Sequence, residues 1–326
     1  MMLHRPRRNR RHENIRSMIR ETHLSPDHFI APLFIIDGKN QKVPVASMPG
    51  QYRLSIDELI KEVKELYSLG VRCVDIFPAI DESLKTPDAR EAYNPDGVNA
   101  RAISAIKEAL PDMTVMADVA LDPYSSAGHD GLVDPNTGEI LNDETLEVLA
   151  KQAICSAKAG ADIIGPSDMM DGRVEFLRRA LDQSGFNNTL IMSYTAKYAS
   201  AFYGPFRDAL GSAPKKGDKK TYQMDPANSN EAVREALLDE AEGADILMVK
   251  PGLPYLDIIY RLKQTSTLPI AAYNVSGEYA MVKAAVQNGW LDNDRVVLET
   301  LLSFRRAGAD IILTYFAKEA AILLNK

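Results

Sequence analysis

Two lysines follow apolar runs of the sequence, where an amine could react with a carbonyl group. Lys250 comes directly after the run 246–249, and Lys197 closely follows the run 190–194. Apolar surroundings disfavour the ammonium form and lower the pKa of a lysine, and a second ammonium nearby lowers it further. An uncharged amine attacks ketones, so the pair predicts Schiff-base chemistry. The alternative interpretation is that each lysine reaches solvent.

Three aspartates lie within or after another largely apolar run, at residues 114–121. They are Asp118, Asp122 and Asp130. Such carboxylates could hold a hard cation such as Mg²⁺, serve as acids and bases, or balance the charge of the lysines. Asp is also common in turns, which is the alternative interpretation.

A long connection runs from Ser193 to about Asn228, and loops of this length in compact domains are usually functional or disordered. Basic side chains on a mobile loop suit a carboxylate or phosphate substrate, although a solvated surface loop would have a similar composition. The basic residues are Arg207, Lys215, Lys216, Lys219 and Lys220. We interpret residues 198–226 as a lid over the site.

Eight short runs rich in Val, Ile, Leu and Ala predict strands that are buried on both faces. They span residues 29–36, 73–78, 114–121, 162–166, 190–194, 246–250, 269–273 and 311–315. Amphipathic stretches separate them, and these predict helices. The predicted helices span residues 55–69, 99–110, 143–159, 172–184, 229–242, 255–264, 276–288 and 292–307.

The alternation of strands and helices predicts a (β/α)₈ TIM barrel, in which catalytic residues lie at the carboxyl ends of the strands. Both lysines and the aspartates are placed at such ends. An open doubly wound sheet is the alternative, but no G-x-G-x-x-G motif follows the first strand.

Charge is unevenly distributed along the chain of 326 residues, whose net charge is -7. Residues 1–20 hold seven Arg and one Glu, a net charge of +6, so subtraction leaves -13 for the remainder. We interpret residues 1–28 as an arm for subunit contacts and residues 29–326 as the catalytic barrel; a disordered basic tail is the alternative. The acidic body argues against a nucleic-acid partner. No apolar run suggests a membrane span or a secretory signal, so a cytoplasmic enzyme is expected.

Several long motifs resemble the porphobilinogen synthase (5-aminolevulinate dehydratase) family, and the resemblance covers nearly the whole chain. They are Gly243–Tyr255, Ser193–Arg207, Pro166–Arg173, Asn274–Tyr279 and Arg5–Arg8 of the arm. The resemblance implies a TIM barrel that condenses two molecules of 5-aminolevulinate to porphobilinogen with loss of two waters. It also implies that Lys250 and Lys197 each hold one substrate as an imine.

The resemblance implies further roles. Asp118 would act near the amine of the second substrate. The remaining substrate contacts would be Arg207 and Lys219 for one carboxylate, Ser276 and Tyr315 for the other, and Phe77 and Ser167 for the pocket wall.

Zinc-dependent members of the family have cysteines where this chain has Ala120, Asp122 and Asp130. Without thiolates there, no catalytic zinc is expected. The chain resembles the aspartate-rich, magnesium-responsive branch, which implies Glu235 as the ligand of an allosteric Mg²⁺ at a subunit boundary, with Asp122 and Asp130 as further candidates. A second departure is Ala127, where many members have histidine. Octamers held by the N-terminal arm are common in the family, and the opposite charges of arm and body agree with this.

Three other functions stay open on the residues alone. A class I aldolase usually needs one imine lysine and no lid of this kind. A hydrolase built on the three aspartates would have no use for paired lysines, and His129 is the only histidine beyond residue 28. A non-catalytic assembly protein would explain the arm but not the lysines.

Overall fold

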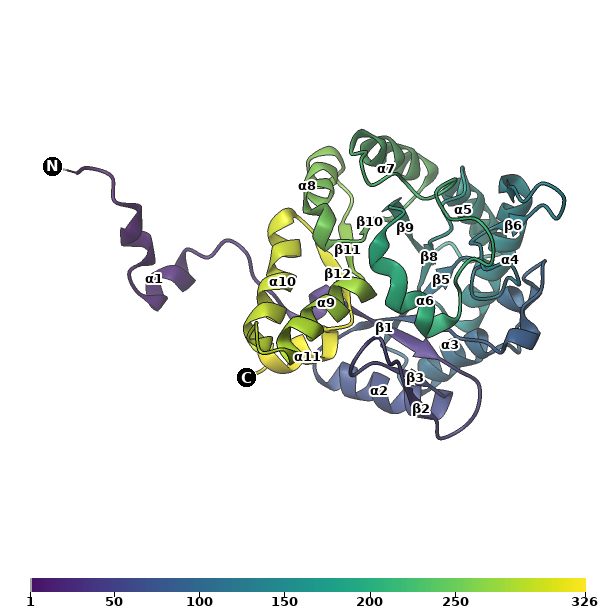
Figure 1. Cartoon of the computed structure of the whole chain (residues 1–326), viewed down its shortest axis with the longest axis horizontal. Coiled ribbons are helices and arrows are strands. Elements are labelled where there is room, and N and C mark those ends of the chain that lie inside the picture. The colour runs from purple at the N-terminus through teal and green to yellow at the C-terminus, as the bar shows by residue number, and fades with distance from the viewer. Residues whose placement is uncertain (1) are drawn as a thin grey trace.

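The computed structural model describes residues 2–326 and shows a closed barrel of eight parallel strands surrounded by helices (Figure 1). In order around the barrel the strands are β1 (Phe29–Ile35), β4 (Cys73–Pro78), β5 (Thr114–Val119), β8 (Ile163–Pro166), β9 (Leu190–Lys197), β10 (Ile246–Lys250), β11 (Ile270–Asn274) and β12 (Ile311–Thr314). Pairing of β12 with β1 closes the ring. The prediction of a TIM barrel is confirmed, and all eight strands begin within one residue of their predicted starts.

The helices bury their apolar faces against the outside of the barrel. In α2, for example, Leu59, Val63 and Leu66 are buried, at the spacing of one helical face. Glycines in the left-handed conformation end α4, α7 and α10. The barrel helices are α2 (Ile56–Ser68), α3 (Val98–Ala109), α4 (Asn142–Ala159), α5 (Arg173–Gln183), α7 (Asn230–Glu242), α8 (Leu256–Thr265), α9 (Ser276–Gln287), α10 (Asn293–Ala307) and α11 (Ala317–Leu324).

The helices around the last strand need one correction. Two helices, α9 and α10, separate β11 from β12, as the predicted ranges 276–288 and 292–307 indicated, but the helix that follows the last strand, α11, was missed. With 8 residues, α11 is too short for a clear helical period in the sequence. Short hairpins add β2 (Lys42–Pro44) with β3 (Tyr52–Leu54), and β6 (Leu132–Val133) with β7 (Ile140–Leu141).

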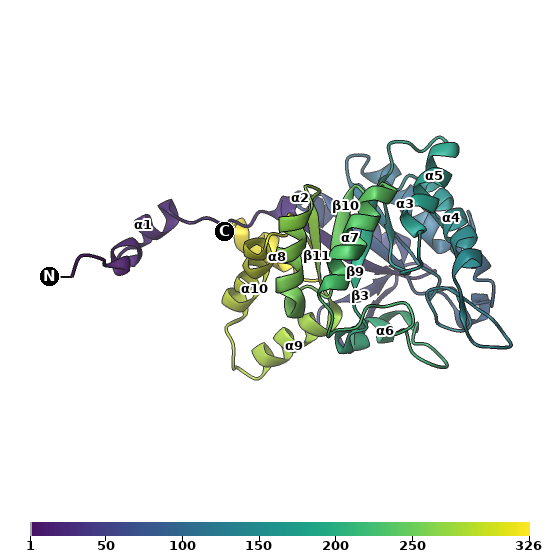
Figure 2. The same ribbon diagram turned by 90° about the horizontal axis from the view of Figure 1, so that it is seen from above.

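The N-terminal arm projects away from the barrel and carries α1 (Glu13–Met18) (Figures 1 and 2). None of the side chains described between residues 2 and 20 is buried. The strand ends on the other side of the molecule from this arm are covered by α6 (Gly204–Leu210) and its flanking loops. Within residues 2–326, no helix combines the length and the apolar character that crossing a bilayer requires.

Candidate active site

Lys250 and Lys197 lie side by side at the carboxyl ends of β10 and β9. Their Cα atoms are register partners, and the two residues are only 5% and 6% exposed. A shift in register makes this possible: Ser193 pairs with Leu247, whereas Ala196 pairs with Val249, so β9 carries one extra residue. Side chains alternate along a regular strand, and such a bulge changes which face the following residues take.

This bulge explains why β9 continues to Lys197, beyond the predicted end at Tyr194. Tyr194 and Lys197 are three positions apart, so their side chains would face opposite sides of a regular strand. With the extra residue, the ring of Tyr194 and the amine of Lys197 both lie in the interior of the barrel, where both are buried.

The amine of Lys250 lies among aromatic rings, with no ion-pair partner among residues 2–326. Its Nζ is 4.6–5.6 Å from the centroids of four rings, those of Tyr273, Tyr194, Phe206 and Tyr203. Burial, followed by the charge of Lys197, lowers the pKa of Lys250 to about 7. A large fraction of this amine is therefore uncharged near neutral pH, as carbonyl attack requires.

The amine of Lys197 has surroundings different from those of Lys250. Its Nζ lies 3.1 Å from Oδ2 of Asp130 and donates a short hydrogen bond to the carbonyl oxygen of Ser167. Asp130 supplies a counter-charge because its loop, 67 residues earlier in the chain, folds back over the strand ends. Lys197 is thus held in an ion pair, whereas Lys250 is not.

The ion pairs continue away from Lys197. Nζ of Lys219 lies 2.6 Å from Asp130 and 3.3 Å from Asp122. The two lysines hold the pKa of Asp130 below its ordinary value despite its burial. Here Lys219, expected to bind a substrate carboxylate, binds two aspartates instead. Asp122 and Asp130 are ion-pair partners of lysines here, and their role as metal ligands stays a prediction.

Asp118 is buried close to both Lys250 and Lys197. Burial raises its pKa to about 6, although the charges of Lys250 and Lys197 act in the opposite direction. Its Oδ1 has no hydrogen-bond partner in the described part of the chain. A carboxyl group with such a pKa can exchange protons near neutral pH.

The lid segment covers these groups and leaves a cavity of about 30 Å³. Phe206 on α6 donates its backbone N–H to the hydroxyl of Ser276, 2.9 Å away, and its ring packs edge-on against Phe77. Arg207 lines the cavity and has no ion pair among residues 2–326, so its guanidinium is available to a carboxylate. Seven predicted residues line this space: Lys250, Lys197, Asp118, Asp122, Ser167, Arg207 and Lys219.

Tyr315 lies in the same aromatic cluster. Its hydroxyl is 3.1 Å from that of Tyr273, whose ring also borders the amine of Lys250. Tyr194 and Tyr273 are the last residues of the predicted strands 190–194 and 269–273, yet neither was singled out from the sequence as a site residue. Their large aromatic side chains stand out in runs of small and branched residues, and this feature could have indicated them as candidate site residues.

Glu235 lies elsewhere, on α7 outside the barrel. Burial raises its pKa, with the nearby carboxylates of Asp239, Asp171 and Glu231 acting in the same direction and Arg173 against it. It forms no ion pair within residues 2–326. Mg²⁺ usually keeps several waters and takes one or two carboxylates from the protein, so a single carboxylate such as Glu235 is compatible with it. No cluster of three or more His, Cys, Asp or Glu suited to a metal occurs in that range.

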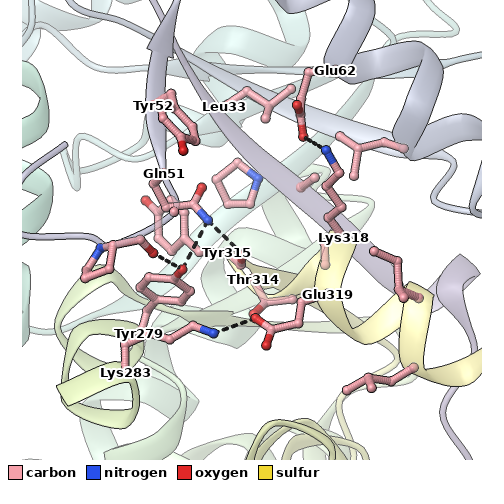
Figure 3. A pocket seen from close by; sticks show the side chains of 18 of the residues that line it. Leu33, Gln51, Tyr52, Glu62, Tyr279, Lys283, Thr314, Tyr315, Lys318 and Glu319 are labelled. Carbon is pink, nitrogen blue, oxygen red and sulfur yellow. Dashed lines mark hydrogen bonds and ion pairs between the residues drawn. The ribbon is translucent and has the colours of Figure 1, made fainter. Parts of the chain in front are cut away.

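A larger cavity of about 420 Å³ lies outside the barrel, between α2, β1, β3, α9 and α11 (Figure 3). Ion pairs Lys318–Glu62 and Lys283–Glu319 cross it, and Gln51 donates a hydrogen bond to the carbonyl oxygen of Tyr315. Neither Lys250 nor Lys197 lines it. We therefore assign the chemistry to the smaller cavity, where the reactive groups converge.

Known proteins resemble this chain over almost its full length. Residues 3–323 match the family model described as "Delta-aminolevulinic acid dehydratase". The chloroplastic delta-aminolevulinic acid dehydratase of Chlamydomonas reinhardtii is 58% identical, with 97% of this chain and 83% of that protein covered. The delta-aminolevulinic acid dehydratase of Bradyrhizobium diazoefficiens is 56% identical, with 97% and 90% covered.

A solved structure is equally similar. The delta-aminolevulinic acid dehydratase (porphobilinogen synthase) of Toxoplasma gondii ME49, in complex with the reaction product porphobilinogen, has a TM-score of 0.97 and 56% sequence identity. The match covers 98% of this chain and 91% of that one.

Proposed function

Because the chain belongs to the delta-aminolevulinic acid dehydratase family, it condenses two molecules of 5-aminolevulinate to porphobilinogen, and we propose that imines at Lys250 and Lys197 carry this reaction. One observation carries the proposal: a buried lysine amine that forms no ion pair among residues 2–326 lies beside a second lysine on the neighbouring strand. Capture of both substrates turns an encounter between two identical molecules into an intramolecular step.

The two lysines differ in what they require before reaction. The amine of Lys250 is already suited to attack a ketone because burial keeps part of it uncharged. Lys197 must first exchange its contacts with Asp130 and Ser167 for the second substrate. Asp118 can then move protons between the intermediates, since its pKa of about 6 lies near that of Lys250.

The substrate carboxylates need cations or hydroxyl donors. We assign Arg207 and Lys219 to one carboxylate, because both line the cavity from the lid side. Lys219 would exchange an aspartate for the substrate. Ser276 and Tyr315 are assigned to the other carboxylate, and Phe77 and Ser167 to the wall around it.

Magnesium is proposed at Glu235, outside the catalytic cavity. The cation would supply positive charge among the carboxylates around α7, and Glu235 would be its protein ligand, with water completing its shell. The aspartates of the cavity have no thiolate beside them, so we propose no catalytic zinc.

We propose that the arm docks onto another copy of the chain, in an octamer. Its side chains are exposed, including apolar ones: Met2, Leu3 and Met18 are 64%, 79% and 79% exposed. The net charge of residues 1–20 is opposite to that of the rest of the chain, which favours docking of the arm on the body of a neighbour. Since several relatives are chloroplastic proteins, the cytoplasmic location stays a prediction.

Reduction with borohydride tests the central proposal. Added to the enzyme with 5-aminolevulinate, it should fix substrate mass on Lys250, and a colour test should detect the pyrrole product. An enzyme that turns over without acquiring any adduct would contradict the imine mechanism. Adduct without pyrrole would favour an aldolase-type reaction.

A further inference from the structure

One buried carboxyl group inside the barrel has no part in the function proposed above. Asp75, in the middle of β4, is 0% exposed, and its Oδ1 has no hydrogen-bond partner in the described range. Its Oδ2 lies 3.5 Å from the hydroxyl of Tyr194. Because side chains alternate along a strand, Asp75 shares the face of Phe77, whose ring packs against Phe206 in the interior. Asp75 therefore lies within the barrel, one layer further in than the lid.

Tyr194 connects this carboxyl group to the reactive amine. Nζ of Lys250 lies 4.9 Å from the ring centroid of Tyr194, and the hydroxyl of that ring faces Asp75. Burial and the charge of Asp118 raise the pKa of Asp75 well above its ordinary value, whereas the charge of Lys250 acts to lower it. Because both groups are buried, the charge at Lys250 therefore influences whether Asp75 holds a proton.

Imine formation creates a charge problem in such a cavity. An amine and a ketone lose water to give a neutral imine, and the reactive iminium carries one proton more. A net charge is costly in surroundings that water does not reach, unless a counter-charge appears nearby. An internal acid that gives up its proton in the same step would leave the total charge of the cavity unchanged.

We propose that Asp75 is a positioning residue for Lys250: the two groups share one proton in the free enzyme, and Asp75 becomes the counter-ion when Lys250 is an iminium. In this step the C=N bond forms and the C–O bond breaks. The ketone oxygen leaves as water with one proton from the amine and one from the carboxyl group. The iminium and the carboxylate remain, and no proton comes from solvent. This inference rests on the proposed imine at Lys250.

The other ionisable groups around Asp75 are less suited to donate the proton that imine formation at Lys250 requires. They are Cys73 on β4, Asp118 on β5, Tyr194 on β9, Tyr273 on β11 and Tyr315 on β12. Burial raises the pKa of the Cys73 thiol and of the three tyrosines, so these four groups stay neutral. Asp118, with a pKa of about 6, is already ionised above pH 7. Asp75 is therefore the acid that keeps a proton where the amine of Lys250 is uncharged.

The test measures how imine formation depends on pH. The probe is 4-oxopentanoate, which keeps the ketone and carboxylate of the substrate but lacks its amine. The fraction of Lys250 carrying the imine is measured between pH 7 and 9 by borohydride reduction and peptide mass. For the wild type, we expect a dissociation constant that changes less than about threefold, because the reaction takes up no proton.

Asp75→Asn removes the shared proton. Imine formation then takes one proton from solvent, so the dissociation constant should rise about tenfold per pH unit. Asp75→Glu should restore the flat dependence. A wild-type constant that itself rises tenfold per unit, or an Asn variant as flat as the wild type, would overturn the role of Asp75. The pH dependence of the wild type is measured without any substitution, so the proposal can be tested even if Asp75→Asn does not fold. Absence of any adduct on wild-type Lys250 would instead contradict the proposed imine.

Discussion

Lys250 and Lys197 face each other across neighbouring strands, yet only Lys197 has a carboxylate partner. In the proposed mechanism the shared position would bring two substrates together, and the different surroundings make the two amines chemically unequal. Burial lowers the pKa of Lys250, whose amine lies among aromatic rings, whereas the amine of Lys197 forms an ion pair with Asp130.

The pH dependence of the reaction at Lys250 follows from its pKa of about 7. Only the uncharged amine attacks, so the rate of imine formation should fall about tenfold per unit below pH 7 and level off above it. Because the charge of Lys197 contributes to the lowered pKa, Lys197→Met should move the midpoint to higher pH. Rapid quenching with borohydride at several pH values measures both. A midpoint unaffected by the substitution would show that the two amines do not interact.

Arg207 should act through substrate binding. Loss of a charged hydrogen bond to a carboxylate costs about 1.5–3 kcal/mol, so Arg207→Ala should raise KM by about 10- to 100-fold. Lys215→Ala is the matched control, since this lid lysine is exposed and pairs with Glu82 at the surface. Steady-state kinetics with 5-aminolevulinate compare the two. Equal values of KM would argue against a carboxylate contact at Arg207.

Asp130 should contribute strongly to stability, because it lies between two buried lysines. Asp130→Asn leaves both ammonium groups without this counter-charge and should lower the free energy of unfolding by about 3–5 kcal/mol. Lys220→Ala breaks an exposed pair with Asp218 and should change it by less than about 1 kcal/mol. Urea denaturation measures both variants. Similar values for the two would mean that the buried ion pairs contribute little.

Glu235 should control the response to magnesium without affecting the chemistry. Glu235→Gln should raise the Mg²⁺ concentration for half-maximal stimulation by at least about tenfold, since magnesium uses few protein ligands. Activity in the presence of a chelator should stay close to that of the wild type. The control is Glu240→Gln, on the same helix and hydrogen-bonded to Ser266. An unchanged magnesium response in Glu235→Gln would place the cation elsewhere.

The arm should determine the size of the assembly. Deletion of residues 2–20 should give smaller oligomers in light scattering after gel filtration. If charge attraction holds the arm, about 1 M salt should weaken the full-length assembly as well, because screening shortens the reach of charges to about 3 Å. An assembly that keeps its size after the deletion would show that the barrels associate without the arm.

The sequence alone determined most of the architecture. Strands buried on both faces are continuous apolar runs, and the covering helices are amphipathic and often end in glycine, so both kinds of element could be read locally. The reactive lysines were identifiable for the same reason, since each stands where an apolar run ends. The predicted starts of β4, β5, β9, β10 and β12 agree with the structure to the residue.

Only the tertiary structure decided which charges meet. The bulge in β9 that turns Lys197 inward has no local signal in its sequence, because it depends on pairing with β10. The Lys197–Asp130 ion pair and the Tyr194–Asp75 contact join residues 67 and 119 positions apart. A sequence shows which groups could ionise, but burial and neighbouring charges set their protonation, and both arise only when the barrel closes.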